Sequence, residues 1–180
     1  MAGGIKSWDS NTAVGSEETG MALFSGRETI EEVLLVAYAL EDGLRDFYLS
    51  MQERVVQEEV KALFGKLSAI EVKHQDRLFA EYEQISDVPL GRRDFARKAE
   101  TETMEGGLTT DEYLALYPTD FTVAAEVISL AMGIEAQALD LYLRAAENCA
   151  QESTRQALRR IAEEERSHLK LLGELLDEMV

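Results

Sequence analysis

Apolar residues recur at steps of three and four along four long stretches of this chain, a spacing that places them on one face of an α-helix. We therefore predict long helices over Glu28 to about Val55, about Gln57 to Ile85, about Phe121 to Asn148 and about Ser153 to Met179. Their apolar seams consist of Leu34, Ala37, Leu44 and Met51; Val60, Phe64, Leu67 and Leu78; Ile128, Ala131, Ala138 and Ala145; and Leu158, Ile161, Leu172 and Leu175. The pattern predicts an all-α protein.

The segments outside these stretches lack a sustained period. Residues 1–26 are rich in Gly, Ser, Thr and Asn, so we interpret them as a leader segment that precedes a single domain over residues 27–180. Prolines and glycines interrupt residues 86–120, where only two short helices are predicted, Arg92–Glu100 and Asp111–Tyr117. We expect this region to be a long crossover between the second and third long helices.

The second pair of long helices repeats the first. An offset of 94 residues relates Glu41 to Glu135, Tyr48 to Tyr142, Leu67 to Ile161, Glu71 to Glu165 and His74 to His168. Such a repeat predicts a four-helix bundle made of two similar helical hairpins. In each hairpin the two glutamates are 30 residues apart. Each glutamate therefore lies about 22 Å from the turn along its helix, so the two side chains lie at the same level of the bundle.

Two glutamates and one histidine interrupt the seams of each hairpin. A Glu and a His three residues apart lie almost one helical turn apart, so their side chains converge on one point. We predict that six side chains bind two metal ions: Glu41, Glu71, His74, Glu135, Glu165 and His168. Without cations, four ionised carboxylates in one core would carry a large desolvation cost, whereas two divalent ions neutralise them as a set.

Ligands that are mostly oxygen, with one imidazole per ion, suit Fe(II) or Mn(II) better than structural zinc. Iron is our first choice and manganese the alternative. The sequence leaves open whether Glu71 and Glu165, or Glu41 and Glu135, bridge the ions. Tyr48 and Tyr142 lie two turns after Glu41 and Glu135 on the same faces, where a phenol could donate a hydrogen bond to a ligand carboxylate. The alternative for both tyrosines is ordinary core packing.

Charge and cysteine content narrow the possible functions. The formal net charge is −17, which would repel phosphate backbones and anionic lipids, so we expect neither nucleic-acid nor membrane binding. Cys149 is the only cysteine, so an internal disulfide and a cysteine-ligated metal site are excluded. With no signal region at Met1–Trp8 and no apolar run of about 20 residues, we expect a cytoplasmic location.

Around the predicted ligands the sequence resembles the rubrerythrin branch of the ferritin-like superfamily, over about residues 28–179. The resemblance rests on Leu40-Glu41, Glu71-Val72-Lys73-His74, Ile134-Glu135 with Tyr142, and Glu165-Arg166-Ser167-His168. It implies a ferritin-like bundle with a non-haem di-iron centre, a reaction with peroxide or dioxygen in oxidative-stress protection, and a homodimer. The leader resembles the C-terminal end of a rhodanese domain, in Ala2-Gly3-Gly4-Ile5-Lys6-Ser7-Trp8 and Glu18-Thr19-Gly20-Met21.

Two departures from that family affect the expected function. Rubrerythrins that act as peroxidases have a further glutamate three residues after the third-helix ligand, where this chain has Ala138, with Leu44 at the repeat-related position. They also usually have a rubredoxin domain with four cysteines, so turnover here needs an external electron donor. The leading hypothesis is an oxidoreductase. The alternatives are iron binding, storage or transfer without turnover, and a metal-free interaction module.

Overall fold

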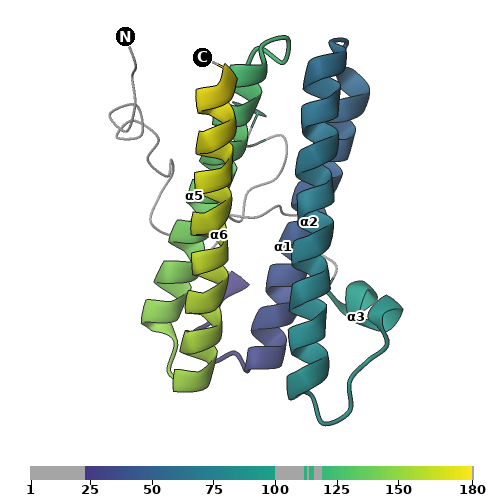
Figure 1. Cartoon of the computed structure of the whole chain (residues 1–180). Coiled ribbons are helices and arrows are strands. Elements are labelled where there is room, and N and C mark those ends of the chain that lie inside the picture. The colour runs from purple at the N-terminus through teal and green to yellow at the C-terminus, as the bar shows by residue number, and fades with distance from the viewer. Residues whose placement is uncertain (1–22, 100–111, 113, 116–118, 180) are drawn as a thin grey trace.

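Four long helices make up most of the part of the chain that the structure, a computed structural model, describes (Figure 1). That part comprises residues 23–99, 112, 114–115 and 119–179. The helices are α1 (Ile30–Arg54), α2 (Glu58–Ile85), α5 (Ala124–Asn148) and α6 (Glu152–Met179), with the short α3 (Arg92–Lys98) after α2. The predicted all-α bundle of two hairpins with a long crossover is confirmed. No helix among these residues is both long enough and apolar enough to cross a membrane.

The two hairpins match residue for residue. We call α1 and α2 hairpin one, and α5 and α6 hairpin two. Adding 94 to the first and last residues of α1 gives those of α5, and the same offset carries α2 onto α6. The turn of hairpin one, at residues 55–57, contains neither Gly nor Pro. Val55 is buried there while Val56 is exposed, so one apolar side chain anchors the turn to the core.

The start of α1 is fixed by its own sequence. Thr29 precedes the helix, and its hydroxyl accepts a hydrogen bond from the Glu32 backbone N–H at 3.3 Å. The Glu32 carboxylate in turn accepts from the Thr29 N–H at 2.8 Å. This reciprocal pair satisfies two backbone donors that a helix start would otherwise leave without partners.

The hairpins lie side by side, and α1 and α5 run in opposite directions. The start of α1 is therefore at the same end of the bundle as the end of α5 (Figure 1). Buried apolar side chains form one cluster at each end. The cluster at the start of α1 includes Leu34, Leu78, Ala138 and Ile161, and the cluster at the other end includes Leu44, Phe64, Ile128 and Leu172. The predicted metal ligands lie between these two apolar clusters, at the middle of every long helix.

The crossover packs on hairpin one through α3. Phe95 of α3 is fully buried, and its ring contacts those of Tyr38, Phe79 and Tyr82 at centroid distances of 5.1, 5.3 and 4.4 Å. Aromatic contacts of this kind fix a short helix that could not persist alone in water. The predicted helix Asp111–Tyr117 lies largely outside the described residues.

The segment before α1 crosses the turn of hairpin two. The Gly26 carbonyl accepts a hydrogen bond from the Ala150 N–H at 3.0 Å, and the Thr154 hydroxyl donates to the Glu28 carbonyl at 3.1 Å. Gly26 has φ of 81°, and a Cβ there would lie 2.6 Å from the Asn148 carbonyl oxygen. Glycine is therefore needed both for the left-handed conformation and for the close approach.

Phe24 extends this contact into the core. It is buried and belongs to the apolar cluster at the start of α1, with its ring centroid 6.3 Å from that of Tyr142. The predicted leader segment otherwise lies outside the described residues up to residue 22.

Candidate metal centre

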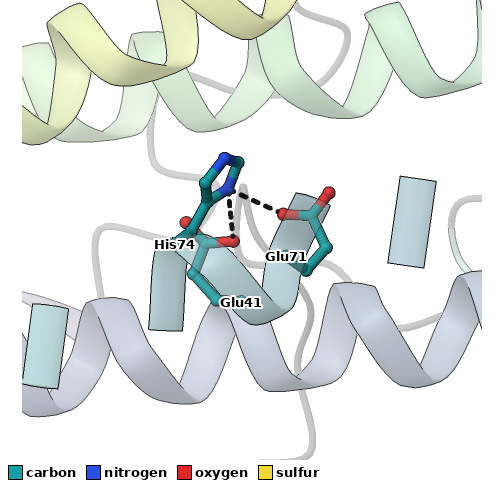
Figure 2. Close-up of side chains that lie close together, drawn as sticks. All are labelled: Glu41, Glu71 and His74. Carbon is teal, nitrogen blue, oxygen red and sulfur yellow. Dashed lines mark hydrogen bonds and ion pairs between the residues drawn. The ribbon is translucent and has the colours of Figure 1, made fainter. Parts of the chain in front are cut away.

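Half-site one, which we define as Glu41, Glu71 and His74, joins the two helices of hairpin one. His74 Nδ1 lies 2.9 Å from Oε2 of Glu71, which precedes His74 by one turn of α2. The same Nδ1 lies 3.3 Å from Oε2 of Glu41 on α1. Figure 2 shows the ring between the two carboxylates, pointing toward hairpin two. The three-residue spacing on α2 produces the first contact, and the equal distance of Glu41 and Glu71 from the turn produces the second.

Half-site two, consisting of Glu135, Glu165 and His168, repeats this arrangement. His168 Nδ1 lies 3.1 Å from Glu165 Oε2 on α6 and 3.3 Å from Glu135 Oε2 on α5. In each half-site, one possible ligand atom per residue can be chosen so that all of them lie within 4.8 Å of one another. Both groups are therefore compact enough to bind one ion each.

The half-sites meet at the centre of the bundle. The rings of His74 and His168 stack with their centroids 3.7 Å apart and their planes 1° from parallel. All six side chains are buried, although they come from four different helices. The structure thus brings together every residue that the sequence predicts as a ligand, in one centre rather than in two separate ones.

Electrostatics at this centre favour the ionised form of Glu135. Burial alone would raise the pKa of Glu135, but its hydrogen bonds with His168 and Glu165 and the charges of His168 and His74 together outweigh burial, so the pKa lies below its ordinary value. Glu135 is therefore held as the charged form that a metal ion requires.

Glu71 provides the clearest sign that a cation fits here. Its Oε2 contacts His74, whereas its Oε1 is buried and has no hydrogen-bond partner among the described residues. A buried carboxylate oxygen without a partner carries a large desolvation cost. A divalent ion among these oxygens and the two Nδ1 atoms would remove that cost, so the donor set fits two ions of a metal such as iron or manganese. That these six residues are ligands stays a prediction.

Both tyrosines singled out from the sequence are fully buried, but at opposite ends of the bundle. Tyr48 belongs to the cluster with Phe64, and Tyr142 to the cluster at the start of α1. Their hydrogen bond to a ligand carboxylate also stays a prediction.

Sequence reasoning missed a polar cluster, Asp42, Arg45 and Gln75, that borders half-site one. The Gln75 amide donates to Asp42 Oδ1 at 2.7 Å, and its oxygen accepts from Arg45 Nη1 at 3.2 Å. Gln75 itself is almost completely buried. The sequence did contain a usable signal. Gln75 directly follows a predicted ligand, and it is polar where the repeat-related residue, Leu169, is apolar.

Comparison with known proteins identifies the family. No significant match was found among curated proteins or among solved structures. The rubrerythrin family matches residues 32–176, a range that contains all six predicted ligands and every long helix of the bundle for almost its whole length. With its two hairpins and its central carboxylate and histidine groups, this ferritin-like helical bundle belongs to the rubrerythrin family.

Proposed function

We propose that this protein is a non-haem di-iron oxidoreductase that reduces peroxide or dioxygen with electrons from an external donor. The single observation that carries the proposal is the pair of buried Glu-Glu-His groups joined by the stacked His74 and His168 rings. Family membership supports the same assignment. Manganese is the alternative metal, because the same oxygen-rich ligand set suits it.

The bound metal pair would supply the redox chemistry, which no protein side chain at this centre can perform. The contribution of the chain is charge, position and exclusion of water. Four carboxylates would balance two divalent ions, and each histidine, in its neutral form, would offer Nδ1 as a ligand. The apolar clusters on both sides keep bulk water away from the ions, which strengthens every electrostatic interaction at the centre.

Electrons would come from outside this chain. Cys149 is the only cysteine and is buried at the end of α5, so no cysteine-bound iron can relay electrons. We further propose a homodimer as the working assembly, as the family resemblance implies.

Metal binding, storage or transfer without turnover is the second candidate, and Ala138 is the observation that favours it. Ala138 and the repeat-related Leu44 are both completely buried in apolar clusters. A fifth carboxylate, which the resemblance associates with peroxidase activity, is therefore absent at both positions.

Anaerobic mixing separates the two candidates. Reduced, iron-loaded protein is mixed with hydrogen peroxide, and the appearance of ferric absorption is followed by stopped flow. Free Fe(II) and the double variant Glu41→Ala/Glu135→Ala are the two controls. We expect two ions per chain and oxidation much faster than with either control. Two ions with oxidation no faster than free iron would reject the oxidoreductase in favour of metal handling. Far less than one ion per chain would reject both in favour of a metal-free module.

A further inference from the structure

The inner contacts of the two half-sites are nearly the same. The Nδ1 to Oε2 distances are 2.9 and 3.3 Å around His74 and 3.1 and 3.3 Å around His168. Each half-site also offers two carboxylates and one imidazole. The two half-sites differ more clearly in the residues around the ligands.

Behind half-site one, the polar cluster ties α1 to α2 at the level of the ligands. Asp42 directly follows Glu41, and Gln75 directly follows His74. The Gln75 amide nitrogen donates a hydrogen bond to Asp42, and its oxygen accepts one from Arg45. Arg45 Nη1 also forms an ion pair with Asp42 Oδ1 at 2.6 Å. Because Gln75 is 1% exposed, sliding or rotating one helix against the other would leave its buried amide without partners.

Behind half-site two, the same positions are apolar. The residues related by the 94-residue offset are Ala136, Leu139 and Leu169, which pack on an apolar cluster. Apolar contact has no preferred direction, so these three residues fix the relative position of α5 and α6 less strictly than the polar cluster fixes that of α1 and α2. His168 is also more exposed than His74, 8% against 3%, so water competes more readily for its half-site.

We propose that the two ions bind in order, half-site one first, because the Asp42, Arg45 and Gln75 cluster holds Glu41 and His74 in place before any ion arrives. This inference rests on the proposed metal-binding function and adds to it a difference between the two positions. A site whose ligands are already fixed loses less conformational freedom on binding. Partners that orient ligands are typically worth about 10- to 100-fold in metal affinity.

The chain contains only two histidines, which makes the order directly observable. Protein with isotope-labelled histidine gives one set of ring signals for each, assigned with His74→Ala and His168→Ala. Zn(II), a diamagnetic stand-in for Fe(II), is added to the metal-free protein, residues 1–180, in small steps. We expect the His74 signals to move to their bound position during the first equivalent and those of His168 during the second.

Gln75→Leu tests the cause, since it installs the residue that hairpin two has at this position. We expect the affinity for the first ion to fall roughly tenfold and the two histidines to respond together. Leu169→Met is the matched control and should leave the order unchanged. If Gln75→Leu fails to fold, Asp42→Asn takes its place as a milder variant that removes the charge facing Arg45. It should reduce the difference in affinity between the two half-sites.

Equal responses of the two histidines in the unmodified protein, or a response of His168 first, would overturn the inference while leaving the metal centre intact. An unchanged order in a folded Gln75→Leu variant, or in Asp42→Asn, would overturn the assigned cause. If neither Zn(II) nor Fe(II) binds, the proposed function itself fails, which is a distinguishable result.

Discussion

The two hairpins have the same helix lengths and the same ligand spacing, yet they fill the space beside their tyrosines differently. In hairpin one, Tyr48 lies beside Phe64 of α2, with ring centroids 6.2 Å apart. The repeat-related residue in hairpin two is the smaller Leu158, and the ring beside Tyr142 is Phe24, from the segment before α1. The repeat preserves the ligand geometry, while packing around it depends on residues from outside the repeat.

A second difference accompanies the first. Hairpin one has Val60 at a buried position near the start of α2, and hairpin two has Thr154, whose hydroxyl donates to the Glu28 carbonyl. The segment that delivers Phe24 is thus also hydrogen-bonded to hairpin two. Three sets of variants test how alike the two hairpins are.

The largest effect is expected from Phe24→Ala. Removing this buried ring should lower the free energy of unfolding by about 4 kcal/mol, because it removes apolar contact and leaves a cavity beside Tyr142. Chemical denaturation followed by circular dichroism measures it. Adding Leu158→Phe, which copies hairpin one, should restore part of the loss. A loss below roughly 1 kcal/mol would show that Phe24 does not complete the core.

The histidine variants should have the next largest effect, now on metal binding. His74→Ala and His168→Ala each remove the imidazole of one half-site, so each should weaken mainly one ion of the pair, by about 100-fold, or about 2.7 kcal/mol. Anaerobic Fe(II) binding isotherms and metal analysis measure the affinities and the stoichiometry. Unchanged values in both variants would contradict the predicted ligand set.

Thr154→Val should have the smallest effect. The change makes hairpin two identical to hairpin one at this position, and it removes one buried hydrogen bond to Glu28, worth about 1 kcal/mol. Thermal unfolding of the variant beside the unmodified protein measures the change. A stability equal to that of the unmodified protein would mean that the hydroxyl does not hold the segment before α1.

Much of this architecture follows from the sequence because helices repeat at short range. The seam positions from Leu34 to Leu172 are buried as predicted, and the 94-residue offset places the six predicted ligands at one height. Each of these conclusions requires only the helical period and the equal distance of the ligands from the turns.

What the sequence did not reveal depends on contacts between distant segments. Phe24 lies in a stretch without periodicity, so nothing local indicates that it is buried. The hydrogen bonds of Gln75 depend on how α1 and α2 are rotated against each other, which the pattern of apolar residues does not fix to within a side chain. The packing of Phe95 against Tyr38 likewise joins segments that only the folded chain brings together.

The short connection at residues 55–57 sets a strict limit on changes in chain length. One residue inserted between that connection and Glu71 would rotate the glutamate by about 100° and move it by about 1.5 Å along α2, off the inner face. The same insertion in the long crossover would leave every ligand where it is. Evolution and protein engineering can therefore lengthen this molecule between its hairpins far more freely than within either of them.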